Sequence, residues 1–221
     1  MRAGEVLFTG IGELALPEAE ASSAAPVRLL RDAQMLVKDG RIEAVGPRGT
    51  LRPHGPADCI DLGGRAVIPG LVDSHTHAVF VGDRIDEMAR RARGETYEEI
   101  AQAGGGIARS VQAMKKASVG ELVAAAVPRL RGMLARGTTT CEVKSGYGLT
   151  PELELKQLHA IRDLADQVPV SIFPTALAHI VPRTYQSTRA AYVDLFCQEV
   201  LGVAATEGLI RFVDVFVESG A

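Results

Sequence analysis

The sequence predicts an α/β protein in which a short β-rich segment precedes a series of alternating strands and helices. Residues 1 to about 65 hold short apolar runs separated by turns, and Asp39-Gly40 between two such runs is a strong β-hairpin signal. From residue 66 onward, strand-like runs alternate with longer amphipathic segments, which is the pattern of a parallel sheet built from strand–helix units. With 221 residues and 47% hydrophobic content, the chain can bury a sizeable core.

We expect two domains, a small β domain over residues 1–65 and a strand–helix domain over residues 66–221. Leu62-Gly63-Gly64 would form the exit turn of the first domain. Within that domain, residues 15–26 are rich in Ala, Glu, Ser and Pro, and this composition predicts a loop.

The second domain shows four apolar strand candidates, at residues 67–73, 138–144, 170–177 and 211–217. Ser118-Val119-Gly120-Glu121 has capping-box spacing, and the helix it opens would bury Leu122, Ala126 and Leu130, with Pro128 kinking it or lying near its first turns. Thr150-Pro151 opens the next helix, whose inner stripe we expect to be Leu158, Ile161 and Ala165. A third helix is expected over residues 187–206.

Composition argues against several classes of partner. The 24 Lys and Arg residues against 27 Asp and Glu residues give a net charge of -3, and no basic block indicates nucleic acid or an anionic membrane. No apolar run approaches the 18 or so residues of a membrane span, and the N-terminus does not read as a signal peptide. The three cysteines are scattered, so we interpret Cys59, Cys141 and Cys197 as small buried residues of a protein in a reducing compartment, the cytoplasm.

The run from Val67 to Phe80 carries the first chemical signal, because an apolar strand ends there in His-x-His. Successive side chains on a strand alternate between faces, so His75 and His77 would point the same way, one step beyond Asp73. Two imidazoles on one face can share a metal ion. A bare His-x-His is common by chance, but its place at the end of a buried strand favours a metal site.

Several further motifs follow in a fixed order: HTHAVFVGDR, TYEEIAQAGGGI, GTTTCEVKSGYGL, ALAHIVP and FVDVFVESGA. Together with PGLVDSHTH, they resemble the imidazolonepropionase family of the amidohydrolase superfamily, over about residues 67 to 221. This resemblance implies a partial (β/α)8 TIM-like barrel, preceded by part of a small β-sandwich domain. Residues 66–221 are too few for eight strand–helix units of about 30 residues each, so we expect the first four or so.

The resemblance also implies a set of site residues at the carboxyl ends of the predicted strands, where barrel enzymes place their chemistry. His75 and His77 would bind a single Zn or Fe ion, and the absence of Lys from residues 212–217 favours one metal over two. Arg84 would hold a propionate carboxylate through its guanidinium fork, and Tyr147 and His179 would contact the rest of the substrate. Lys144, Ser145, Gly146 and Glu218 also follow strands and would converge on the same mouth.

The implied reaction is the hydrolysis of 4-imidazolone-5-propanoate to N-formimino-L-glutamate, a step of histidine degradation. The family's acid and base residues and its remaining metal ligands would lie beyond Ala221, so the catalytic residues stay unassigned and the chain looks truncated. We therefore expect the 221-residue chain alone to lack turnover and to bind metal weakly. Two alternatives stay open: another cyclic amidohydrolase or deaminase, and a non-catalytic half-barrel. Assembly into a homo-oligomer is also left open.

Overall fold

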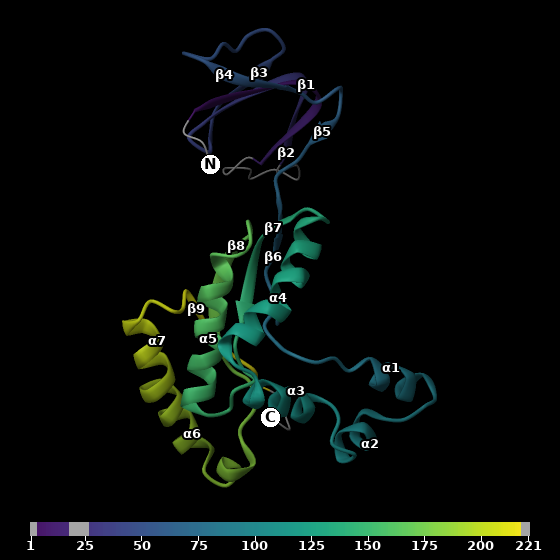
Figure 1. Cartoon of the computed structure of the whole chain (residues 1–221), viewed down its shortest axis with the longest axis vertical. Coiled ribbons are helices and arrows are strands. Elements are labelled where there is room, and N and C mark those ends of the chain that lie inside the picture. The colour runs from purple at the N-terminus through teal and green to yellow at the C-terminus, as the bar shows by residue number, and fades with distance from the viewer. Residues whose placement is uncertain (1–3, 18–26, 218–221) are drawn as a thin grey trace. The chain divides into compact units, whose positions relative to one another are not determined.

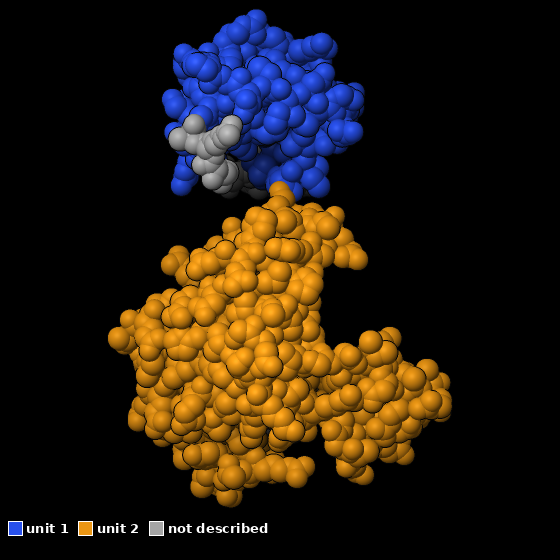
Figure 2. All heavy atoms as spheres, viewed as in Figure 1, with its two compact units in different colours: residues 1–69 blue, residues 70–221 orange. Residues whose placement is uncertain are grey.

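The structure is a computed structural model that describes residues 4–17 and 27–217. The chain divides into two compact units, Met1–Pro69 and Gly70–Ala221, shown in different colours in Figure 2. Each unit has its own sheet and its own group of buried apolar side chains.

The first unit is a five-stranded sheet with the order β3-β2-β1-β4, and β5 also pairs with β1. Its strands are β1 (Glu5–Pro17), β2 (Val27–Lys38), β3 (Arg41–Pro47), β4 (Ala57–Asp61) and β5 (Ala66–Val67). The predicted hairpin is confirmed, since β2 and β3 pair in antiparallel fashion around Asp39 and Gly40, both at positive φ. The expected loop at 15–26 is wrong for residues 15–17, which belong to β1, and its remainder lies outside the described residues.

The second unit is organised around four parallel strands in the order β6-β7-β8-β9 (Figure 1). They are β6 (Leu71–Asp73), β7 (Thr138–Lys144), β8 (Ser171–Ala178) and β9 (Phe212–Val215), close to the four predicted runs. The first run is the exception, because Ala66–Val67 pairs with β1 and the run is interrupted at Pro69-Gly70. The curled parallel sheet with helices between its strands confirms the predicted half-barrel class of fold.

Helices connect these strands. Between β6 and β7 lie α1 (Ile85–Ala92), α2 (Tyr97–Gln102), α3 (Ile107–Lys116) and α4 (Val119–Leu134), and α5 (Pro151–Ala165) joins β7 to β8. Between β8 and β9 lie the short 3-10 turn η1 (Arg183–Tyr185) and one continuous helical stretch of α6 (Arg189–Leu195), the π-helical η2 (Phe196–Leu201) and α7 (Gly202–Thr206). None of the helices in the described part of the chain is long and apolar enough to cross a membrane.

The predicted helix signals hold with one correction. Ser118 and Glu121 form both halves of a capping box, and α4 runs without interruption through Pro128. On α5, Leu158 and Ile161 are fully buried, but Ala165 is exposed and Leu164 takes its place in the core. Residue 164 lies three positions after 161 and 165 lies four, and both spacings are compatible with one helix face, so the periodicity alone did not decide between them.

The two faces of the parallel sheet differ in chemistry. Cys141, Val143 and Ala176 face the helices and share a buried cluster with residues of α4 and α5 such as Leu130 and Leu158. Alternation along the strands therefore sends Glu142, Lys144, Thr175 and Asp214 to the opposite, inner face. The edge strand β9 carries exposed apolar residues, among them Phe212, Val213 and Val215, and an edge strand of this kind can pair with a further strand.

The cysteines depart from expectation. Cys141 is fully buried, but Cys59 and Cys197 are exposed, so the interpretation of all three as buried residues is wrong for two of them. Burial, with a smaller contribution from Asp73, raises the pKa of the Cys141 thiol to about 11. At neutral pH this thiol stays protonated and shielded, and it should react slowly.

We predict that a thiol-specific disulfide reagent at pH 8 modifies Cys59 and Cys197 rapidly and Cys141 at least a hundredfold more slowly. Mass spectrometry of tryptic peptides assigns each site, and a Cys59→Ser, Cys197→Ser variant isolates the slow thiol. In denaturant all three should react at similar rates. Fast modification of Cys141 in the folded chain would contradict its place in the core.

Candidate functional site

The His-x-His segment follows β6 directly and stays beside β7. The Lys144 N–H donates to the Thr76 carbonyl at 3.0 Å, and the Thr76 hydroxyl donates to the Glu142 carbonyl at 2.5 Å, so the pairing continues past Asp73. Along this hydrogen-bonded segment His75 and His77 lie close together, with ring centroids 5.6 Å apart. The structure thus places the two predicted metal ligands side by side.

Two further predicted residues meet His77. Tyr147 follows β7 and its ring centroid lies 5.4 Å from that of His77, while His179 follows β8 at 5.7 Å from both rings. The three side chains come from the carboxyl ends of three neighbouring parallel strands, as the strand-end argument predicted. On its other side, His179 meets the ring of Phe216, beyond β9, at 5.6 Å.

Electrostatics favours neutral side chains in this ring cluster. Burial, and then the nearby His179, His75 and Lys144, lower the pKa of His77 to about 4. Burial likewise lowers the pKa of His179 and raises that of the Tyr147 phenol. The Nδ1 atoms of His77 and His179 are buried and have no hydrogen-bond partner among the described residues. Neutral imidazoles with an unpaired ring nitrogen are the form that binds a metal ion.

A cavity of about 460 Å³ opens beside the rings, and His77, Arg84 and Tyr147 line it. The Arg84 side chain is partly exposed, and its Nη1 is 4.0 Å from Glu87 Oε2, a contact too long to occupy the guanidinium fork. Arg109, which sequence reasoning missed, also lines the cavity, but its Nη1 donates to both oxygens of Asp86 at 2.7 and 2.8 Å. Arg84 is therefore the freer of the two cations.

The inner face of the sheet holds a polar network that sequence reasoning did not find. Lys144 Nζ donates to Glu142 Oε1 at 2.6 Å and to Asp214 Oδ2 at 2.7 Å, and the Thr175 hydroxyl donates to Glu142 at 2.6 Å. Lys144 was expected at the mouth of the site, and its ammonium lies on the inner face, bonded to two carboxylates and near enough to His77 to help lower the pKa of that ring. In the sequence, Glu142 and Lys144 alternate with the apolar Cys141 and Val143, and this alternation could have indicated that one face of the strand is polar.

Side chains from the helices bind the backbone of the site loops. Arg129 of α4 donates to the carbonyls of Ala78 and Phe80 at 3.1 and 2.8 Å and lies 3.6 Å from the centre of the Phe80 ring.

Ser145 was also expected at the mouth, but its hydroxyl accepts from the Leu177 N–H at 3.2 Å, between two strands. Glu218, the last polar residue predicted at the mouth, lies outside the described residues.

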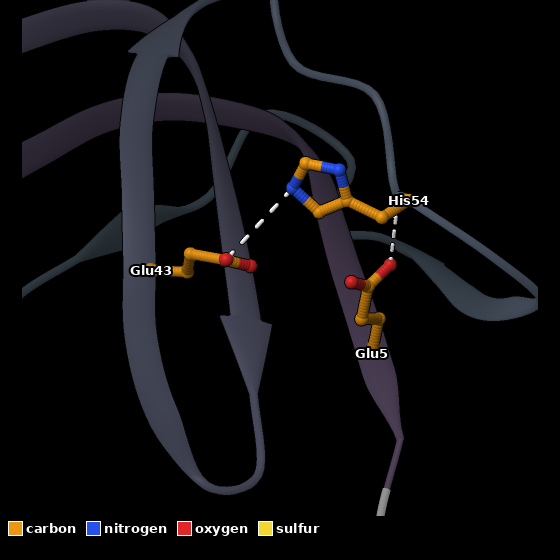
Figure 3. A group of neighbouring side chains, drawn as sticks. All are labelled: Glu5, Glu43 and His54. Atoms are coloured by element: carbon orange, nitrogen blue, oxygen red, sulfur yellow. Dashed lines mark hydrogen bonds and ion pairs between the residues drawn. The ribbon is translucent and has the colours of Figure 1, made fainter.

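A second histidine–carboxylate group occurs in the first unit. One donor atom from each of Glu5, Glu43 and His54 lies within 4.8 Å of the others (Figure 3). However, Glu5 Oε2 already accepts the His54 N–H at 2.7 Å, and Lys38 Nζ lies 3.7 Å from Glu5 Oε1. A cation there would compete with an ammonium group, so these contacts account for the cluster as part of the sheet's own bonding.

Comparison with known proteins adds a close sequence match. No family model matches the chain. An imidazolonepropionase of Symbiobacterium thermophilum is 47% identical over 234 aligned residues, which cover 100% of this chain and 54% of the relative. Imidazolonepropionases of Deinococcus radiodurans and Myxococcus xanthus are 45% and 50% identical and are covered over 53% and 45% of their lengths, with 98% and 84% of this chain matched.

Solved structures show the same fold at lower sequence identity. A triazine hydrolase of Arthrobacter aurescens superposes on 96% of this chain and 46% of its own, with a TM-score of 0.64 and 19% identity. An atrazine chlorohydrolase from the same species, complexed with zinc, gives a TM-score of 0.63, and Escherichia coli guanine deaminase gives 0.54. The chain spans about half the length of the curated relatives it matches, and over most of its own length its sequence is similar to imidazolonepropionases.

Proposed function

We propose that this chain supplies metal-binding and substrate-binding residues of an imidazolonepropionase, which opens the ring of 4-imidazolone-5-propanoate to give N-formimino-L-glutamate. The observation that carries the proposal is the shared cavity of His77, Arg84 and Tyr147, in a chain 44–50% identical to enzymes of that name. A cation, a phenol and a metal-binding ring around one cavity suit a small ring that bears a carboxylate. We place this activity in the cytoplasm.

His75 and His77 are the proposed ligands of one Zn or Fe ion. Their rings are adjacent, and the unpaired, buried Nδ1 of His77 fits a metal site. One structure of similar fold is a zinc complex, which makes zinc the first ion to test. When bound, such an ion lowers the pKa of water and polarises a carbonyl oxygen, the two requirements of amide hydrolysis.

The remaining residues would bind and orient the substrate. The Arg84 guanidinium can form two parallel hydrogen bonds with a propionate carboxylate. Because burial raises the pKa of Tyr147, its phenol keeps its proton and can donate a hydrogen bond to the ring. His179, which burial keeps neutral, can accept or donate one at the same ring. Opening the ring also requires a proton for the leaving nitrogen, and we assign that step to none of the residues named above.

The alternatives from the sequence differ in what Arg84 would do. A deaminase or another cyclic amidohydrolase would share the fold, as the guanine deaminase does, but a substrate without a carboxylate gives Arg84 no partner. A non-catalytic half-barrel would bind no substrate, so it would need neither the Arg84 guanidinium nor a carboxylate partner for it. Loss of the Arg84 guanidinium therefore separates the proposals.

We predict that Arg84→Ala raises KM for 4-imidazolone-5-propanoate at least tenfold, about 1.4 kcal/mol of lost binding. The assay uses a chimera in which residues 1–221 replace the matching part of the Symbiobacterium thermophilum relative. Arg84→Lys, which keeps the charge and loses the fork, should fall between wild type and Arg84→Ala. Metal content should stay near one ion per chain.

Arg131→Ala, an exposed arginine on α4, serves as the control and should leave KM unchanged. If the chimera is active and Arg84→Ala leaves its KM unchanged, Arg84 does not belong to the substrate site. A folded, metal-loaded chimera without turnover would contradict the proposed function itself.

For the metal, we predict that His77→Ala lowers the zinc affinity of the 221-residue chain at least tenfold, since it removes one of two adjacent donors. Equilibrium dialysis with elemental analysis measures the binding. His54→Ala tests the other histidine–carboxylate group and should change the affinity less than twofold. The reverse pattern would move the metal site to the first unit.

A further inference from the structure

Two polar side chains of α5, Glu154 and Gln157, are buried against the loop that carries Tyr147. Their exposed fractions are 1% and 0%, and as residues i and i+3 they share one face of the helix. Charged and amide groups are seldom this deeply buried unless every polar atom is satisfied. The partners of these two side chains show what their burial achieves.

Glu154 binds three backbone N–H groups of the loop. Its Oε2 accepts from Gly146 at 2.8 Å, and its Oε1 accepts from Gly148 at 2.7 Å and Leu149 at 2.9 Å. Leu149 has a φ of +63°, a conformation that costs an L-residue about 1 kcal/mol or more. At Gly148 a Cβ would collide with the backbone of Leu153 and Glu154. The carboxylate thus stabilises a loop conformation that the chain would not adopt unaided.

Gln157 completes the arrangement and reaches a second loop. Its Oε1 accepts the Tyr147 N–H at 3.1 Å, and its Nε2 donates to the Val79 carbonyl at 2.9 Å. Val79 lies two residues after His77, so one side chain fixes the backbone beside both His77 and Tyr147. The two segments that carry these site residues are therefore linked by one side chain, through hydrogen bonds to their backbones.

The four consecutive N–H groups of residues 146–149 are all taken by these two side chains. Loops with several exposed N–H groups commonly bind anions through their backbone, but here the protein provides the carboxylate. What the loop still offers to the cavity is the Tyr147 side chain, beside His77 and Arg84.

We propose that Glu154 and Gln157 are positioning residues that hold Tyr147 at a fixed place against the His77 segment. They act through the backbone, so they contribute to ligand binding only by way of Tyr147. The part of this proposal that concerns a ligand rests on the proposed function, whereas the part that concerns the loop does not.

The test compares Glu154→Gln, Gln157→Met, Tyr147→Ala and the double variant Glu154→Gln/Tyr147→Ala in the zinc-loaded chimera of residues 1–221 with the Symbiobacterium thermophilum relative. The probe is imidazole-4-propionate, a stable molecule with a ring and a propionate, and its dissociation constant is measured by calorimetry. We expect Glu154→Gln to weaken binding about fivefold and Tyr147→Ala about tenfold. The double variant should bind no worse than Tyr147→Ala, because the two residues act in series. Multiplying effects would overturn the proposal.

Hydrogen–deuterium exchange supplies a readout that needs no ligand. In Glu154→Gln and Gln157→Met, amide exchange of a peptide spanning residues 145–150 should accelerate at least tenfold relative to the rest of α5 and β8. The control for lost stability is Leu164→Ala, which changes a fully buried core residue of the same helix. This variant should not accelerate exchange in the 145–150 peptide more than elsewhere. Equal exchange in all three variants would refute the positioning role. If the wild-type protein does not bind the probe but exchange of residues 145–150 accelerates as expected, the result contradicts the proposed function and supports the positioning role.

Discussion

The parallel pairing of β6, β7, β8 and β9 is the constraint on which the site depends. Parallel strands in one sheet end at the same edge, so residues separated by about a hundred positions in sequence meet there. β6 is the shortest member, with three paired residues and a register shift between Leu71 and Val72, and the contacts of Thr76 with β7 continue the pairing toward the two histidines. Without that extension, His75 and His77 would lie on an unsupported loop.

The loops at this edge are held by polar side chains from the surrounding helices. Arg129 fixes the segment after His77, and Glu154 and Gln157 fix the one that carries Tyr147. A buried hydrogen bond contributes about 1 kcal/mol net, but leaving one of its partners unsatisfied costs about 1–3 kcal/mol, so such a network favours a single loop conformation. The apolar contacts between sheet and helices provide stability, and the polar ones determine where the site residues lie.

Sequence reasoning predicted what depends on local pattern. Alternation placed His75 beside His77, capping chemistry placed the start of α4 at Ser118, and Asp39-Gly40 gave the hairpin. The roles of Arg84, Tyr147 and His179 came from resemblance, and the structure adds their proximity to His77. Glu154 and Gln157 could not be found, because on a helix they look like any solvated pair until the fold shows what they face. The choice between Leu164 and Ala165 likewise required the packing of α5, because residues three and four positions after Ile161 can share its face.

Anomalous scattering at the zinc edge from crystals of the zinc-loaded chain tests the central claim most directly. The account predicts one peak within coordination distance of both His75 and His77, with the rings of Tyr147 and His179 beside it. A peak among Glu5, Glu43 and His54, with none at the carboxyl end of β6, would contradict it.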